Sequence, residues 1–307
     1  MTAPAVLVED LHVAYGKTWA LDGVDLTAAA GSTLGVLGHN GAGKTTLIRT
    51  LTTLVRPTVG RVQIEGLDVA DATAVRRRIG VTGQYAGLDE FLTARENLEL
   101  IGRLSGLRRT ARARADALID RLGLDEYATR RVGDLSGGSR RRIDLAASLV
   151  GSPSVLFLDE PTTGLDPIAR AGLWDVVDEL TTSGTTVVLT TQYLEEADRL
   201  ADHIVVLSRG RVAARGTPTE LKRIVGGKVL TATVPTGQLA DLPFIPDTDH
   251  RVDDGRVRVS VTVDDAPAAT ELVAHLHRGG IAVADLDVTS PSLDDVFTHL
   301  AHAGAHR

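Results

Sequence analysis

The stretch GHNGAGKT, residues 38–45, follows an apolar β-rich run and leads into a periodic segment, residues 44–55, that predicts a helix. It matches the pattern G-x-x-x-x-G-K-[ST], which forms a phosphate-binding loop, the P-loop, when it stands between a strand and a helix. Gly38, Gly41 and Gly43 allow the backbone to curl so that successive N–H groups face a phosphate, and the helix that follows adds the positive end of its dipole. We therefore expect a nucleotide phosphate at this loop.

The side chains after the glycines have separate expected roles. Lys44 would bridge the β- and γ-phosphates, and Thr45 would give its hydroxyl oxygen to Mg²⁺. The alternative is a glycine-rich turn that carries a lysine by chance, and the flanking strand and helix disfavour it. The predicted nucleotide contacts of this loop are Gly38, His39, Asn40, Gly41, Ala42, Gly43, Lys44, Thr45 and Thr46.

The sequence VLFLDE, residues 155–160, supplies a second part of the expected site. A carboxylate at the end of a buried strand is costly unless it meets a cation or hydrogen-bond donors, so Asp159 is predicted to orient the Mg²⁺ shell through water. Glu160 lies one residue further and is predicted to polarise the water that attacks the phosphate. The alternative for such an acidic pair is a solvated loop or a helix cap, and the presence of a P-loop disfavours it.

Two apolar β-branched runs, residues 154–159 and 185–191, predict strands that are buried on both faces. The segment between them, residues 166–184, has helical spacing, and a strand, a helix and a strand in this order imply a parallel α/β core. Residues 86–150 are instead predicted to be mostly helical. A hairpin turned at residues 209–210 is predicted near the end of the core.

A change of pattern after residue 226 predicts a domain boundary. Residues 1–226 would form a nucleotide-binding domain, and residues 227–307 would form a small C-terminal α+β accessory domain. The predicted strands of the second domain are residues 228–234, 256–263 and 281–288, and its predicted helices are residues 266–278 and 292–303.

The bulk composition restricts the function classes. Hydrophobic residues make up 43% of the chain and charged residues 24%, which suits a globular protein with an ordinary core. The net charge of −7 disfavours binding to nucleic acid, because that binding needs clustered Lys and Arg. The sequence has no cysteine, so disulfides and thiolate metal sites are excluded. No apolar run reaches the roughly 18 residues that span a bilayer, so we expect any membrane span to come from another chain.

Residues 134–146, DLSGGSRRRIDLA, place a second phosphate cradle at the start of a helical segment. Ser136, Gly137 and Gly138 combine small size, exposed N–H groups and a helix N-terminus, which together favour an anion. An ordinary loop is the alternative for these three residues taken alone. Because one chain does not need two cradles, we expect the second to hold the γ-phosphate of a nucleotide bound by another copy, in a homodimer.

With these motifs, residues 1 to about 222 resemble the nucleotide-binding subunit of an ABC transporter. The resemblance implies an α/β P-loop NTPase core with a helical signature subdomain, and ATP and Mg²⁺ held between two subunits. It implies that Tyr15 stacks on adenine, although Tyr15 alone would be an ordinary strand residue. Gln84 matches the glutamine that touches Mg²⁺ and the interface with the membrane subunit, and Asp166 matches a residue that crosses the dimer.

Further stretches are similar to the daunorubicin/doxorubicin-resistance group of these subunits, which carries a small C-terminal domain. They are VTGQYAGLDEFLTARENL, TTQYLEEAD (190–198) and PSLDDVF (291–297). The implied function is ATP hydrolysis that drives a separate integral membrane permease, at the cytoplasmic face of the cell membrane, in the export of a drug or hydrophobic compound. The alternatives are a soluble ABC ATPase with a regulatory or non-transport role, and a C-terminal domain that binds a regulatory ligand.

Three residues depart from the family pattern. His39 replaces a proline of the P-loop, and Ser139 replaces a glutamine that follows the serine and glycines of the signature motif. Gln192 replaces the switch histidine. Its amide donates and accepts hydrogen bonds but carries no proton away, so we predict that Gln192 senses the γ-phosphate while Glu160 is the base. The alternative is a glutamine that caps the helix after it.

Overall fold

The computed structural model describes residues 3–83, 87–225, 227–243, 247–252, 255–264, 266–289, 292, 293 and 296. The chain divides into two compact units, Met1–Thr217 and Pro218–Arg307. The division comes before the boundary expected after residue 226, because helix α8 (Pro218–Val225) goes with the second unit. The extent of an independently folding domain on either side stays a prediction.

The first unit is built on a six-stranded sheet in the order β10-β9-β3-β8-β7-β6. Five of its strands, namely β3 and those from β6 to β9, run parallel, and β10 pairs antiparallel with β9 at the edge. The predicted parallel α/β core and its edge hairpin are therefore confirmed. The hairpin turns at Arg209 and Gly210, which both have positive φ, as a tight turn of this kind requires. The strands are β3 (Thr33–Leu37), β6 (Ile79–Thr82), β7 (Val155–Asp159), β8 (Thr186–Thr191), β9 (His203–Ser208) and β10 (Arg211–Gly216).

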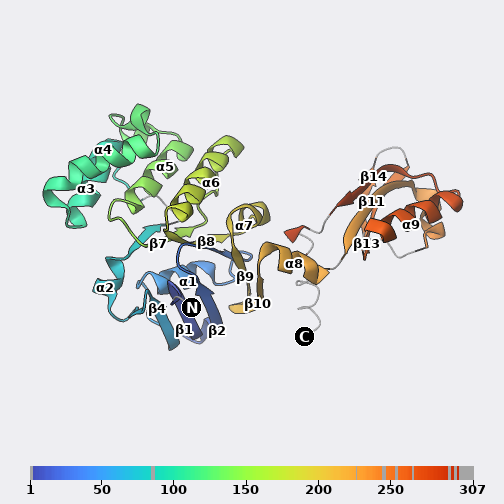
Figure 1. Cartoon of the computed structure of the whole chain (residues 1–307), viewed down its shortest axis with the longest axis horizontal. Coiled ribbons are helices and arrows are strands. Elements are labelled where there is room, and N and C mark those ends of the chain that lie inside the picture. Colours follow the sequence, from blue (N-terminus) through green and yellow to red (C-terminus); the bar gives the residue numbers. More distant parts are fainter. Residues whose placement is uncertain are drawn as a thin grey trace. The chain divides into compact units, whose positions relative to one another are not determined.

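The central strands β7 and β8 are buried on both faces, which explains their nearly continuous apolar sequences. Val155 and Phe157 of β7 join the same core as helix α1, together with Val188 of β8. Leu156 and Leu158 face the opposite core, which the helical segment covers. Figure 1 shows α3 to α6 gathered on one side of this sheet and α1 on the other. The sheet therefore separates two hydrophobic cores.

Among the residues described, three α-helices lie between β6 and β7, inside the segment 86–150, and α6 connects β7 to β8. Helix α3 begins with a capping box, in which the Thr93 hydroxyl accepts from the N–H of Glu96 at 3.2 Å and the Glu96 carboxylate accepts from the N–H of Thr93 at 2.8 Å. None of the helices that the structure describes is long and apolar enough to span a bilayer. The helices are α3 (Ala94–Leu104), α4 (Ala111–Arg121), α5 (Gly137–Ser148) and α6 (Pro167–Thr182), with 3₁₀ turns at Arg108–Thr110, Asp125–Tyr127 and Val132–Asp134.

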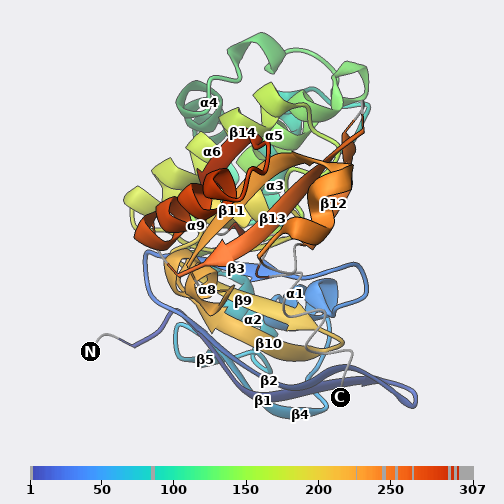
Figure 2. The same ribbon diagram turned by 90° about the vertical axis from the view of Figure 1, so that its right-hand side faces the viewer.

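A second, antiparallel sheet in the order β2-β1-β4-β5 packs with helix α1 (Lys44–Leu51) in one core (Figure 2). The helix is shorter than the predicted 44–55, so that prediction was wrong at its C-terminal end. The helix ends because Thr53 adopts a positive φ and the N–H groups of the next two residues turn back to the carbonyl oxygen of Arg49. The remaining elements of the unit are β1 (Val6–Tyr15), β2 (Thr18–Ala28), β4 (Val59–Ile64), β5 (Leu67–Asp68), α2 (Ala72–Arg76) and α7 (Leu194–Leu200).

In its described part, the second unit contains an antiparallel sheet in the order β12-β13-β11-β14, and helix α9 lies across β11 and β13 (Figure 2). Ala269 and Leu276 of α9 pack with Leu230 and Val259 of the sheet in a separate core. The helix predicted at 292–303 lies almost entirely outside the described residues. The elements are β11 (Lys228–Pro235), β12 (Asp247–Val252), β13 (Arg256–Val263), α9 (Ala266–Arg278) and β14 (Ala284–Thr289), with a 3₁₀ turn at Thr236–Asp241.

Candidate active site

The P-loop joins the end of β3 to the start of α1, and the surroundings of two of its positions require glycine. Gly43 has a φ of 109° at the N-cap of α1, and a Cβ atom there would lie 2.8 Å from the carbonyl oxygen of Ala20. A Cβ atom at Gly38 would lie 2.6 Å from the carbonyl oxygen of Leu207. The first turn of α1 contains no acidic residue, so the positive end of the helix dipole meets no carboxylate from that turn. The loop is therefore shaped to receive an anion.

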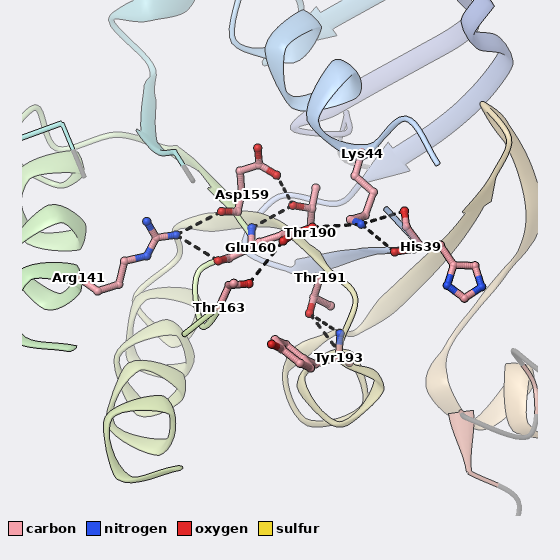
Figure 3. A network of polar contacts seen from close by, with 10 residues as sticks. His39, Lys44, Arg141, Asp159, Glu160, Thr163, Thr190, Thr191 and Tyr193 are labelled. Carbon is pink, nitrogen blue, oxygen red and sulfur yellow. Dashed lines mark hydrogen bonds and ion pairs between the residues drawn. The ribbon is translucent and has the colours of Figure 1, made fainter. Parts of the chain in front are cut away.

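The Lys44 side chain is turned back into the P-loop and is only 4% exposed. Its Nζ atom donates to the carbonyl oxygens of Gly38 at 2.7 Å and of His39 at 3.2 Å. The same ammonium lies 3.1 Å from Oε1 of Glu160, whose side chain is 10% exposed (Figure 3). The structure thus brings Lys44, predicted to bridge the phosphates, against Glu160, predicted to polarise the attacking water. A bound phosphate would compete with the Glu160 carboxylate for the Lys44 ammonium.

Thr190, a threonine of β8, is hydrogen-bonded to both Asp159 and Glu160 (Figure 3). Oγ1 of Thr190 donates to Oδ1 of Asp159 at 2.6 Å and accepts from the backbone N–H of Glu160 at 3.1 Å. Glu160 has a φ of 49°, a conformation that costs about 1–3 kcal/mol in residues other than glycine. The pairing of β7 with β8, which sets Asp159 beside Thr190, supports this backbone. Thr190 was not singled out from the sequence, because a threonine in a β-branched strand gives no sign of what its hydroxyl contacts.

The residues predicted to hold Mg²⁺ are described in part. Thr45 is exposed in the first turn of α1, and Asp159 has a buried carboxylate at the end of β7. Gln84 lies outside the described residues. Where the structure is described, no group of three or more His, Cys, Asp or Glu side chains could hold a metal ion. One hydroxyl and one carboxylate nevertheless fit Mg²⁺, which commonly takes its other ligands from nucleotide phosphates and water.

An open cavity of about 550 Å³ lies over the P-loop, and Glu160 and Trp19 are in its wall. Tyr15, which is predicted to stack on adenine, and Trp19 are both 50% exposed. Trp19 lines the cavity, whereas Tyr15 is not in the wall that the described residues form. Trp19 is therefore a further candidate for contact with the base. Its only sign in the sequence is an aromatic residue in a mixed strand. The predicted loop residues that line the cavity are His39, Asn40, Gly41, Gly43, Lys44, Thr45 and Thr46, whereas Gly38 and Ala42 are buried and are not in its wall.

The signature segment, Ser136 to Gly138, begins helix α5. Oγ of Ser136 accepts from the backbone N–H of Ser139 at 3.2 Å and lies 2.9 Å from the Ser139 hydroxyl. Ser136 and Gly137 are exposed, and within the described part of the chain this segment is not in the wall of the cavity over the P-loop. Ser139, which replaces the usual glutamine, thus contacts the signature serine of its own chain.

Asp166 caps helix α6. Its Oδ1 atom accepts from the backbone N–H of Ala169 at 2.9 Å, and Pro167 occupies the first helical position. This contact fixes the carboxylate at the N-terminus of α6 within its own chain. The place of Asp166 across a dimer stays a prediction.

Gln192 is half-buried and lies one residue beyond β8. The N-cap position of α7 belongs to Tyr193, and no side chain caps the helix, so the alternative role of Gln192 as a helix cap is wrong. Oγ1 of Thr191 accepts from the N–H of Tyr193 at 2.9 Å. The guanidinium of Arg170 lies 4.9 Å from the centre of the Tyr193 ring. These contacts fix the chain on both sides of Gln192.

Changing Gln192 to Ala should slow ATP hydrolysis by about ten- to a hundredfold, because a hydrogen bond to a charged group contributes about 1.5–3 kcal/mol. The rate is measured as phosphate release at saturating ATP, and Gln63→Ala, on strand β4, is the control. Gln192→His should add a titration near neutral pH, seen as the difference between its pH profile and that of the wild type. An unchanged rate for Gln192→Ala would contradict the sensor role.

Helix α7 also buries a carboxylate. Glu196 is fully buried, and its Oε1 atom accepts from the indole N–H of Trp174 at 3.2 Å. Burial raises the pKa of Glu196, against the lowering effect of the hydrogen bond from Trp174. The contact ties α7 to α6. It was not foreseen, because a pair of glutamates in the first turn of a helix is typical of an exposed helix N-terminus.

Two family models and several known proteins are similar to this chain. The family model described as ABC transporter matches residues 21–163, and the model described as ATP-binding protein DrrA1-3-like, C-terminal domain, matches residues 216–301. The daunorubicin resistance ATP-binding protein DrrA3 of Streptomyces coeruleorubidus is 52% identical over 305 residues, with 98% of this chain and 96% of the relative covered. The doxorubicin resistance ATP-binding protein DrrA of Mycobacterium tuberculosis is 43% identical over 309 residues, with 95% and 92% covered.

A similar solved structure is the dimeric ATP-binding cassette MJ0796 in a post-hydrolysis state, bound to ADP and phosphate. It has a TM-score of 0.62 and 28% identity to this chain, and the match covers 69% of this chain and 98% of that chain. The segment matched by the first family model contains the P-loop, the signature segment, Asp159 and Glu160. The motifs found in the sequence therefore lie in the part of the chain that resembles these proteins.

Proposed function

The chain belongs to the family of ABC transporter ATP-binding proteins, an ATP-hydrolysing family, and we propose that it drives the export of a drug or hydrophobic compound through a separate membrane permease. The observation that carries this proposal is the 52% identity to a daunorubicin resistance ATP-binding protein over 98% of the chain. A soluble ABC ATPase with a regulatory or non-transport role is not favoured, because the similarity to resistance proteins extends through the second unit.

The chemistry follows from the ion pair between Lys44 and Glu160. A γ-phosphate at the N-terminus of α1 would compete with Glu160 for the Lys44 ammonium, since both are anions. Glu160 would then accept a proton from the attacking water, while Thr190 holds its backbone N–H. Thr45 and Asp159 would hold Mg²⁺, which would supply positive charge to neutralise the nucleotide.

We place a second copy of the chain against the signature segment. Ser136 and Gly137 are exposed at the start of α5, and the similar cassette bound to ADP and phosphate is a dimer. A nucleotide in the P-loop of one copy would then meet the N–H groups at the start of α5 of the other copy. Each site would be completed by the partner.

A second, larger cavity is the docking surface that we propose for the permease. It has a volume of about 970 Å³ and lies where α3 and α5 meet α2 and β6. Gly83 and Gly87, which flank Gln84 in the sequence, line it together with Leu104, an exposed residue, and residues 76–77, both arginines. Apolar and basic side chains together suit a permease segment that carries apolar and acidic side chains. Through this contact the chain would sit at the cytoplasmic face of the cell membrane.

The test is to identify the integral membrane protein that copurifies with the full-length chain and to place the pair in proteoliposomes. Daunorubicin or doxorubicin should stimulate ATP hydrolysis by the pair, and ATP should drive movement of the drug across the vesicle membrane. The Glu160→Gln chain, which should hydrolyse ATP far more slowly, is the control. Hydrolysis that no candidate drug stimulates would contradict drug export, and a chain without ATPase activity would contradict the proposal as a whole.

A further inference from the structure

Three consecutive arginines lie in the first turns of helix α5, and the structure gives each a different direction. Arg140 lies 3.3 Å from the carboxylate of Glu90. Arg142 donates to the carbonyl oxygen of Leu122, in the helical segment, at 2.7 Å. Arg141 instead turns toward the end of β7, where the predicted site residues Asp159 and Glu160 lie. The middle arginine is therefore the one that contacts the candidate active site.

The buried Arg141 guanidinium donates to four backbone carbonyl oxygens. Nη2 donates to the carbonyl oxygens of Asp159 at 3.2 Å and Glu160 at 3.3 Å, and Nε donates to that of Pro161 at 2.9 Å. Nη1 donates to the carbonyl oxygen of Gly83 at 2.5 Å. Figure 3 shows the guanidinium beside Asp159 and Glu160. One side chain thus holds three consecutive peptide groups around Glu160 and a fourth just after β6.

Asp144 lies three residues after Arg141, on the same face of α5. Its Oδ2 atom lies 3.5 Å from Nη1 of Arg141, and its Oδ1 atom accepts from the backbone N–H of Gly87 at 3.0 Å. Burial raises the pKa of Asp144 to about 6, against the lowering effect of the Gly87 N–H and of Arg141. Asp144 is therefore mostly ionised above neutral pH and balances the buried guanidinium. Asp144, Gly83 and Gly87 all line the larger cavity.

We propose that Arg141, balanced by Asp144, is a positioning residue for ATP hydrolysis that fixes the backbone of Glu160 and links it to the wall of the larger cavity. The reason is geometric. Glu160 has a positive φ, its N–H is bonded to Thr190, and Arg141 holds its carbonyl oxygen on the other side. The same guanidinium holds Gly83, so a change in the cavity wall would reach the catalytic loop through one side chain. This inference goes beyond the proposed function and depends on it only for ATP turnover as the signal.

Arg141→Lys and Arg142→Lys are a matched pair, because the same substitution is made at neighbouring positions of one helix. Lysine keeps the charge but lacks the planar fork that reaches several carbonyl groups at once. Arg141→Lys should lower kcat by about tenfold or more, while the KM for ATP and the affinity for a fluorescent ATP analogue change by less than about threefold, because the nucleotide contacts are untouched. Arg142→Lys should keep kcat within about twofold of the wild-type value.

Further measurements separate positioning from loss of folded protein. Turnover is expressed per nucleotide-binding site, and Asp144→Asn, which keeps an acceptor for the Gly87 N–H, should lower kcat by a smaller factor than Arg141→Lys. In the Glu160→Gln background, Arg141→Lys should cause no further fall in the single-turnover rate, because it acts through that carboxylate.

Three results would overturn the proposal: a wild-type kcat in Arg141→Lys, equal losses in Arg141→Lys and Arg142→Lys, or a full additional loss in the Glu160→Gln background. A wild-type chain that hydrolyses no ATP would instead contradict the proposed function.

Discussion

Glu160→Gln should bind ATP and hydrolyse it about 10²–10⁴ times more slowly than the wild type. The glutamine amide cannot accept the proton of the attacking water, whereas the contacts of Thr190 and Arg141 with the backbone of this residue are kept. The substitution also removes the carboxylate that pairs with Lys44, so ATP binding should not weaken. Turnover is measured as phosphate release at saturating ATP. The ATP-bound dimer, which should persist, is measured by size-exclusion chromatography.

The control for this prediction is Glu179→Gln, which changes a glutamate paired with Arg121 on the surface at 2.9 Å. Its turnover should stay close to the wild-type value, because surface ion pairs contribute little to stability. A Glu160→Gln protein with wild-type turnover would reject the assignment of Glu160 as the base.

Lys44→Met should weaken ATP binding by about ten- to a hundredfold and lower kcat/KM by about a thousandfold or more. Methionine keeps the aliphatic stem of the buried side chain but removes the ammonium that donates to Gly38 and lies 3.1 Å from Glu160. The variant therefore loses a ligand of the phosphates and the cation that balances Glu160. Binding is measured with a fluorescent ATP analogue, and turnover is measured as phosphate release.

Lys222→Met, on helix α8 of the second unit, is the matched control, and its ATP affinity should equal that of the wild type. Thermal unfolding without nucleotide shows whether Lys44→Met is folded. A folded Lys44→Met protein with wild-type affinity and turnover would contradict the role of the lysine.

The parallel core of the fold was predicted because local sequence patterns mark its strands and its connecting helix. The apolar runs at 154–159 and 185–191, with a helical segment between them, become the parallel strands β7 and β8 and helix α6. Strand β2 (Thr18–Ala28) was not predicted, because register shifts in its pairing with β1 disturb the alternation of buried and exposed residues. The C-terminal end of α1 was also not predicted. The positive φ that ends this helix is at Thr53, so no glycine in the sequence marks the position.

By itself, the sequence determined which residues are expected to act on the phosphate. The spacing of the P-loop gives Lys44, and the end of an apolar strand gives Asp159 and Glu160, because these signals depend only on near neighbours in the chain. Only the tertiary structure decided what holds them. Thr190 lies 30 residues after Glu160, and Arg141 lies 19 residues before it. Three adjacent arginines are chemically identical in the sequence, and only the packing of α5 beside β6, in the core that also contains β7, decides which guanidinium reaches the catalytic loop.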